Sequence, residues 1–368
     1  MVDPRISRLA HLLVNYSVAV TPGDKVLIRG NSNTLPLVAE TFREVLRAGG
    51  HPTVFWEEDI FSEILLKEGN DDQLCYVSDP VKIVMETYDC LIALRGSENT
   101  RTLSNVDTQR QQIARAAGRD LMKTFMERSA RRELRWTTTI YPTNAHAQEA
   151  DMSLTDFADF VFAACHVDKE NPVAEWQKVR AYQQTLVDWL AGKKQVVVKG
   201  PNVDLTLSIE GRTFINADGT ANMPDGEVFT GPVENSVNGW IRYTYPAIYS
   251  GREVEGIEMQ FVDGRVASAT AKKNEAFLHS VLDTDPGARY LGEFAIGTNY
   301  GIDRFTKSIL YDEKIGGTLH TAVGSGYPET GSQNISAVHW DMICDMRDGS
   351  QIWVDDELFY ENGQFVVA

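Results

Sequence analysis

Residues 25–56 read KVLIRGNSNTLPLVAETFREVLRAGGHPTVFW, and this stretch decides the fold class of the first half of the chain. Lys25–Gly30 is a short apolar run that follows a Pro-Gly-Asp turn, which is typical of a buried strand. Residues 35–49 have helical spacing and stop at a Gly-Gly pair, and His51–Trp56 predicts the next strand. A strand, a helix and a second strand in close succession indicate a βαβ unit with parallel strands.

The same alternation continues after this unit. A helix over residues 80–88 precedes a strand at Cys90–Arg95, and Trp136–Tyr141 predicts another strand. Phe160–Ala164 is either a further strand or the end of a helix. We therefore expect an α/β domain with a mostly parallel sheet over residues 1–193. The Gly-x-Gly-x-x-Gly pattern of a dinucleotide site is absent after the first strand, and Gly30–Asn33 is read as a connecting loop.

The pattern changes after a long amphipathic helix predicted between Asn171 and Lys193. Short strand-like segments follow, separated by Gly, Asp and Asn turns: Val196–Lys199, Asp204–Ser208, Glu255–Val262, Val266–Ala271 and Ile352–Val354. Closely spaced short strands of this kind are typical of antiparallel sheets. We expect a second, β-rich α+β domain over residues 194–368.

Composition excludes several classes of function. The formal net charge of -17 argues against binding nucleic acid and favours cations, such as metals or peptide ammonium groups. The four cysteines show no C-x-x-C spacing, and most lie in an apolar context, as Cys75 does between Leu74 and Tyr76, so we expect buried free thiols in a reducing compartment. The N-terminus has no signal-peptide pattern, and no apolar run approaches the length of a membrane span. These features predict a cytoplasmic protein without membrane segments.

Residues that can bind metals gather in the second half of the chain. His339 and Asp341 lie two apart, and on a strand such a pair points to the same face, where it can hold one divalent ion. His320 lies upstream, shortly after an Asp-Glu pair that ends at Glu313. Glu227 and Glu293 precede it, near glycines and small residues. Each side chain also has an ordinary interpretation, as a hydrogen-bonded structural histidine or a surface carboxylate.

The chemistry of a two-metal hydrolase requires this mixture of residues. Carboxylates neutralise paired cations, imidazoles fix the geometry, and the metals activate a water molecule. A further donor must stabilise the oxyanion of the tetrahedral intermediate. Tyr327 follows His320 on a Gly-rich loop and could supply this donor, although it could equally be a tyrosine packed at the base of the loop.

Four segments resemble the metallopeptidase family of aminopeptidase T and aminopeptidase S. They are NMPDGEVFTGP (222–232), YLGEFAIGTN (290–299), DEKIGGTLHTAVGSGYP (312–328) and SAVHWDMI (336–343). The resemblance implies a metal-dependent aminopeptidase that removes N-terminal residues from short peptides. It also implies an N-terminal α/β domain, a C-terminal β-rich domain that carries the metals, and a homodimer.

The site is carried over from the family residue by residue. The resemblance implies the metal ligands Glu227, Glu293, Glu313, His320, His339 and Asp341, and it implies catalytic roles for Tyr327 and Glu293. Glu293 is the expected bridging ligand, and Glu313 acts as a ligand or as a general base. Two divalent ions are expected, and the nitrogen and oxygen ligands accept Zn, Co or Mn.

Two alternatives remain open. His320, His339 and Asp341 form the two-histidine, one-carboxylate set of non-haem iron oxygenases, and a ring-cleaving dioxygenase acting on a dihydroxypyridine resembles a divergent relative of the family. Glu227 and Glu293 argue against this reading, because a single iron does not need a second pair of carboxylates. In the other alternative the fold binds a peptide or partner without turnover, and the complete ligand set argues against it.

Overall fold

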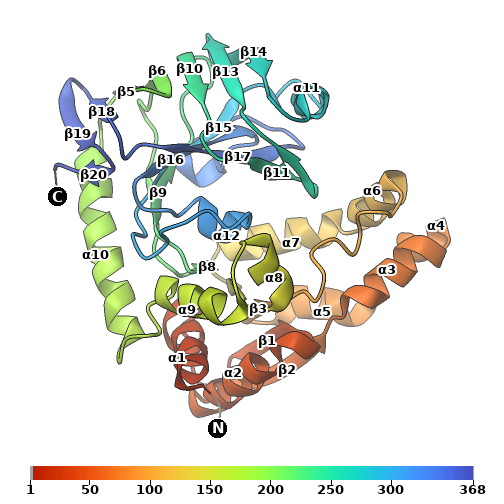
Figure 1. Cartoon of the computed structure of the whole chain (residues 1–368). Helices are drawn as coiled ribbons and strands as arrows, with labels where there is room; N and C mark the ends of the chain where they lie inside the picture. The colour runs from red at the N-terminus through yellow and green to blue at the C-terminus, as the bar shows by residue number, and fades with distance from the viewer. Residues whose placement is uncertain (1–2, 368) are drawn as a thin grey trace. The chain divides into compact units, whose positions relative to one another are not determined.

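The computed structural model describes residues 3–367 (Figure 1). The chain forms two compact units, and each is described separately. The first contains the chain up to Glu175 together with Gly219–Pro224. The second contains Trp176–Asp218 and the residues from Asp225 onward.

The first unit is built on a parallel sheet of five strands in the order β2-β1-β3-β4-β8. The strands are β1 (Lys25–Gly30), β2 (His51–Trp56), β3 (Cys90–Arg95), β4 (Arg135–Ile140) and β8 (Asn222–Met223). The first three strands match the predicted bounds, and the predicted strand at residues 136–141 is shifted by one residue. The apolar side chains of β1 and β3 are buried, because helices cover both faces of a parallel sheet.

Phe160–Ala164 is not a strand. These residues end helix α9 (Leu154–Ala164), which begins where the Ser153 side chain accepts a hydrogen bond from the Asp156 N–H. The place at the sheet edge beside β4 is taken instead by β8, which comes from the segment Gly219–Pro224. A run of five apolar residues fits a buried helix end as well as a strand, so periodicity alone could not separate them.

The helices of the first unit are mostly short (Figure 1). Their bounds are α1 (Pro4–Leu12), followed by the π-helical turn η1 (Leu13–Ser17), the 3-10 turn η2 (Ser32–Thr34), α2 (Leu35–Arg47), α3 (Asp59–Glu68), α4 (Asp71–Leu74), α5 (Asp79–Thr87), α6 (Thr108–Ala117), α7 (Arg119–Ala130), α8 (Asn144–Glu149) and α9. The predicted helix at residues 35–49 is confirmed as α2, which stops before Gly49, where φ is 83°.

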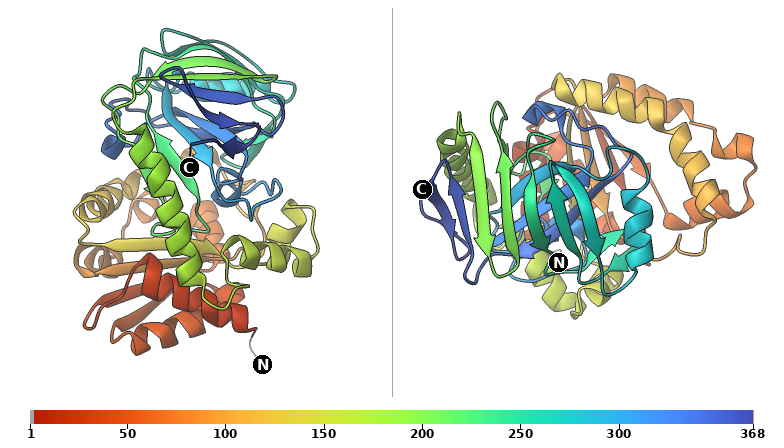
Figure 2. Two further views of the ribbon diagram at one scale, coloured as in Figure 1. Left: turned by 90° about the vertical axis from the view of Figure 1, so that its left-hand side faces the viewer. Right: turned by 90° about the horizontal axis from the view of Figure 1, so that it is seen from above.

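The second unit stacks two antiparallel sheets. The larger sheet has eight strands in the order β14-β13-β10-β6-β5-β18-β19-β20, and the right-hand view of Figure 2 looks onto it. Its strands are β5 (Gln195–Gly200), β6 (Val203–Ser208), β10 (Asn238–Arg242), β13 (Glu258–Val262), β14 (Arg265–Thr270), β18 (Gln351–Val354), β19 (Glu357–Glu361) and β20 (Gln364–Phe365). The predicted strand at residues 255–262 is too long, because β13 begins only at Glu258, after a left-handed Gly256.

The smaller sheet has five strands in the order β17-β16-β15-β9-β7. They are β7 (Ile215–Ala217), β9 (Glu227–Thr230), β15 (Leu291–Gly297), β16 (Thr318–Gly324) and β17 (His339–Asp345). One apolar core joins the two sheets, since buried side chains of β6 and β13 cluster with those of β15, β16 and β17. Burying one face of each sheet in this way leaves the other face of the smaller sheet free to carry polar groups.

The remaining elements of the second unit are a two-stranded ribbon, three α-helices and the 3-10 turn η3 (Pro328–Thr330). The ribbon pairs β11 (Ala247–Tyr249) with β12 (Arg252–Val254), and the helices are α10 (Pro172–Leu190), α11 (Glu275–Leu282) and α12 (Ile309–Asp312). The long helix predicted between residues 171 and 193 is confirmed as α10, of which Trp176 and Leu186 are fully buried. Within residues 3–367 no helix combines the length and apolar character needed to cross a membrane.

Candidate metal centre

Four neighbouring strands of the smaller sheet carry five of the predicted metal ligands. Glu227 begins β9, Glu293 lies in β15, His320 lies in β16, and His339 and Asp341 lie in β17. The register pairs Gly297 with Glu227, Ala295 with His320, and Ala322 with Asp341. Adjacent strands in this register bring side chains from distant parts of the chain to one place on the sheet.

All five side chains project from the same face of that sheet. In β17 the alternate residues Trp340 and Met342 belong to the apolar core, so His339 and Asp341 point to the opposite face. In β16, Leu319 likewise belongs to the core. The register of β15 shifts between Leu291 and Glu293, and such an irregularity re-aims side chains next to functional sites. The predicted same-face geometry of His339 and Asp341 is confirmed.

Glu293 lies at the middle of the cluster. Its Oε1 is 3.5 Å from His320 Nε2, and its Oε2 is 3.3 Å from His339 Nε2. His320 Nε2 is also 3.3 Å from Glu227 Oε2, and His339 Nε2 is 3.5 Å from Asp341 Oδ1. Two sets of three potential ligands therefore share Glu293: one with Glu227 and His320, the other with His339 and Asp341.

Glu313 follows α12 and belongs to the same cluster. One of its oxygens forms a third potential ligand set with His320 and Asp341. The neighbouring carboxylate of Asp312 is buried and accepts hydrogen bonds from the N–H and hydroxyl of Thr306. This bonding anchors the end of α12 and thereby places Glu313 at the cluster.

Tyr327 is held beside the cluster by two rings. Its ring lies 5.3 Å from that of Phe229 and 5.2 Å from the imidazole of His339, measured between centroids. The Nδ1 of His339 is 2.8 Å from the carbonyl oxygen of Ser325, which lies on the same Gly-rich loop as Tyr327. When Nδ1 carries the proton and donates it to this carbonyl, Nε2 is free to act as a ligand.

Charges in the cluster perturb one another strongly. Burial alone would lower the pKa of His339, but Asp341 and Glu293 raise it to about 12. Burial also opposes charge on His320, whereas Glu227 and Glu293 raise its pKa to about 9. Burial would raise the pKa of Asp341, but His339 holds it at about 2. The carboxylates thus favour positive charge at the positions between them.

The side chains fit divalent ions. Among the described residues, Glu227 Oε2, both ring nitrogens of His320 and Asp341 Oδ1 are buried without a hydrogen-bond partner. Buried polar atoms without partners are costly, and the three residues that carry them belong to ligand sets whose ligand atoms lie within 4.8 Å of one another. Imidazole and carboxylate donors in such sets suit Zn, Co or Mn.

Two charged residues near the cluster were not expected from the sequence. Lys314 and Asp225 are almost completely buried, and Lys314 Nζ lies 2.7 Å from Glu227 Oε1. Burial opposes charge on Lys314, but Glu227 and Glu313 raise its pKa well above the ordinary value. The one sequence signal was a lysine directly after an Asp-Glu pair, which is also common on exposed surfaces.

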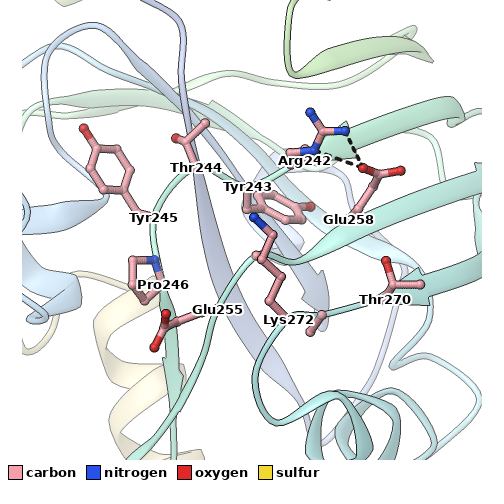
Figure 3. A pocket seen from close by; sticks show the side chains of 11 residues that line it. Arg242, Tyr243, Thr244, Tyr245, Pro246, Glu255, Glu258, Thr270 and Lys272 are labelled. Carbon is pink, nitrogen blue, oxygen red and sulfur yellow. Dashed lines mark hydrogen bonds and ion pairs between the residues drawn. The ribbon is translucent and has the colours of Figure 1, made fainter.

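A pocket in the second unit is lined by residues outside the ligand cluster. It has a volume of about 690 Å³ and is lined by residues that include Arg242, Tyr245, Glu258 and Lys272 (Figure 3). Arg242 is paired with Glu258, as the dashed lines in Figure 3 show, with a shortest distance of 2.8 Å. None of the predicted site residues lines this pocket.

Comparison with known proteins identifies the family. The model of a family described as thermophilic metalloprotease (M29) matches residues 2–365. The chain belongs to the M29 family. The predicted resemblance is thereby confirmed, since the relatives of this M29 chain are named aminopeptidases. Aminopeptidase 2 of Geobacillus stearothermophilus is 24% identical over 350 residues, covering 89% of this chain and 84% of that protein. Aminopeptidase T of Thermus aquaticus is 33% identical over 186 residues, covering 46% and 45%.

Two solved structures share the fold of this M29 chain. Wild-type AmpT from Thermus thermophilus matches with a TM-score of 0.86 at 22% identity, covering 99% of both chains. The 2,5-dihydroxypyridine dioxygenase of Pseudomonas putida KT2440 matches with a TM-score of 0.60 at 13% identity, covering 99% of this chain and 97% of the other. The predicted combination of a parallel α/β region and an antiparallel β-rich region is confirmed.

Proposed function

We propose that this protein is a dinuclear metalloaminopeptidase that removes N-terminal residues from short peptides. The observation that carries the proposal is that two potential ligand sets share Glu293, whose two oxygens approach different histidines. A carboxylate placed in this way is suited to bridge two cations. The names of the relatives, all aminopeptidases, support the reaction class.

Each ligand has a role in this proposal. Glu227 and His320 would hold one ion, His339 and Asp341 would hold the other, and Glu293 would be shared between them. Divalent ions in such a site polarise the scissile carbonyl and lower the pKa of a bound water molecule. Glu313 completes the set as a ligand or as the general base that moves the proton to the leaving amine.

Tyr327 is the proposed oxyanion donor. Its phenol is held against His339 and Phe229, at the edge of the ligand cluster. A hydroxyl placed there can donate a hydrogen bond to the oxygen that becomes negative in the tetrahedral intermediate. An acidic cluster also attracts the ammonium group of a peptide N-terminus, which fits an exopeptidase that starts from that end.

Four further properties belong to the proposal. Short peptides are the expected substrates, a homodimer is the expected assembly, and the cytoplasm is the expected compartment. The native metal is Zn, Co or Mn, since the same nitrogen and oxygen donors accept all three.

The test combines metal content with hydrolysis. Purified protein should contain close to two metals per chain by elemental analysis, and it should release the chromophore from a leucine chromogenic amide when Zn or Co is present. The N-acetylated amide serves as the matched control and should not be hydrolysed, because it lacks the free ammonium group. One iron per chain without hydrolysis would favour the oxygenase hypothesis. The dioxygenase that shares this fold provides the specific alternative. Neither metal nor activity would leave a binding protein.

A further inference from the structure

Lys314 places a positive charge inside the ligand cluster. Only 1% of its side chain is exposed. Its Nζ donates to Glu227 Oε1 at 2.7 Å, lies 3.8 Å from Asp225 Oδ1, and also donates to Glu313 Oε1. Two of these three partners, Glu227 and Glu313, are proposed metal ligands, so this inference rests on the proposed function.

The backbone holds Lys314 in this position. Its N–H donates to the Tyr311 carbonyl and its carbonyl accepts from the Asn299 N–H, both at 3.0 Å. A side chain at Gly297 would meet the carbonyl oxygen of Ile315 at 2.2 Å, so the two segments are in close contact. The backbone of Lys314 is therefore held by packed neighbouring segments, and its ammonium group does not sit on a mobile surface side chain.

Lys314 leaves the cluster-facing oxygens free. It binds Oε1 of Glu227, whereas Oε2 of the same carboxylate has no hydrogen-bond partner and lies 3.3 Å from His320 Nε2. Glu313 is likewise bound through Oε1 and still offers an oxygen to the set with His320 and Asp341. The lysine thus bonds both carboxylates, and in Glu227 it leaves free the oxygen that faces His320.

The negative charge of the cluster explains why a buried lysine is useful there. Glu227, Glu293, Glu313 and Asp341 are four carboxylates in one largely buried cluster. Buried carboxylates without a counter-charge repel one another and oppose folding. We propose that Lys314 is a positioning residue that serves as one resident counter-ion of the metal-free centre, beside the two histidines. It holds Glu227 and Glu313 in place so that the chain folds before the metals bind.

The test compares thermal unfolding with and without metal. Lys314→Met keeps the length of the side chain and removes its charge. After dialysis against a chelator, the Tm of this variant should fall by roughly 10 °C relative to the wild type. Saturating Zn²⁺ or Co²⁺ should recover most of that loss, because the ions replace the missing positive charge. The metal-induced rise in Tm should therefore be larger in Lys314→Met than in the wild type.

Two further variants serve as a control and as a test of the pairing between Lys314 and Glu227. Lys199→Met removes a lysine from an exposed pair with Asp204 and should change neither Tm nor its response to metal. The double variant Lys314→Met/Glu227→Gln removes both charges of one buried pair and should regain part of the metal-free loss. If Lys314→Met does not fold without metal, refolding from urea should succeed only when Zn²⁺ is added.

Three results would overturn the proposal. They are an unchanged metal-free Tm in Lys314→Met, an equal loss of Tm with and without metal, and failure to refold even with Zn²⁺ present. None of these readouts requires turnover. Absence of hydrolysis by the wild type would instead count against the proposed function, so the two failures can be told apart.

Discussion

The ring of Tyr327 meets the imidazole of His339 edge-on, with centroids 5.2 Å apart and an interplanar angle of 71°. Phe229 packs against the same tyrosine at 5.3 Å. The phenol is therefore held by ring packing, and its hydroxyl is not required to keep the ring in place. Removing only the hydroxyl should test its chemical role without disturbing the packing.

Tyr327→Phe should lower kcat by roughly 10²- to 10³-fold, because one donor to the oxyanion is lost. KM, metal content and Tm should stay close to the wild type. The measurement is steady-state hydrolysis of the leucine amide, with Tyr300→Phe as the matched control on an exposed tyrosine. An unchanged kcat would remove Tyr327 from the mechanism and leave it as a packing residue.

Glu293→Gln should abolish detectable turnover and lower the metal content from about two ions per chain to about one. The amide keeps the shape of the side chain but cannot neutralise two cations. Elemental analysis and the hydrolysis assay measure the two effects together. Glu329→Gln, on an exposed residue of the turn η3 (Pro328–Thr330), is the control. Full activity in Glu293→Gln would contradict the bridging role.

Arg212→Met should destabilise the segment around Gly331 that follows Tyr327. The Arg212 side chain is 7% exposed, donates to Glu234 Oε2 at 2.6 Å and also bonds the Gly331 carbonyl. Glu234 Oε1 in turn accepts from the Gln333 N–H at 2.7 Å. Loss of this pair should lower the free energy of unfolding by about 3 kcal/mol. Urea titration measures the change, and a loss below the scatter of the titration would refute it.

Asp24→Asn should destabilise the first unit in a pH-dependent way. Burial alone would raise the pKa of Asp24, but the Thr21 N–H and the Arg135 guanidinium lower it below its ordinary value. A lowered folded-state pKa contributes stability above the unfolded value of about 4, and this stability is lost as the pH falls through the folded pKa. Asp24→Asn should therefore lower the free energy of unfolding by about 2 kcal/mol at pH 7.

The difference in the free energy of unfolding between the wild type and Asp24→Asn should become smaller as the pH is lowered toward 4 and below. Urea unfolding at several pH values measures it. Asp204→Asn, which removes the acid of an exposed ion pair with Lys199, should show little difference at any pH. An Asp24→Asn penalty that stays constant with pH would contradict the charge-based explanation.

The four cysteines should differ sharply in reactivity. Cys75 is exposed, whereas Cys90, Cys165 and Cys344 are buried. Burial raises the pKa of Cys90 and of Cys344 to about 12 each and raises that of Cys165 further. Ellman's reagent should label one thiol quickly in the native protein and four after denaturation. Cys75→Ser should remove the fast phase; a fast phase that persists would disprove the assignment.

Local patterns in the sequence were sufficient for most of the first unit's strands. Lys25–Gly30, His51–Trp56 and Cys90–Arg95 have the predicted bounds. The information is local because a buried strand needs a run of apolar residues between turn residues, and both lie close together in the chain. The same pattern left Phe160–Ala164 open between a strand and the end of a helix, and the structure shows the helix end. The expected burial of Cys75 is wrong, because its apolar neighbours do not bury it.

The sequence by itself determined the types of residue at the candidate site and the family. Carboxylates and histidines suited to metals are visible in four ordered segments, and the M29 match spans residues 2–365. Only the tertiary structure decided which side chains meet. The pairing of β9, β15, β16 and β17 brings Glu227, Glu293 and His320 together.

The structure also placed Lys314 among these ligands and added β8 to the parallel sheet. Strand order and register depend on which faces are buried against distant segments, so no window of neighbouring residues contains them.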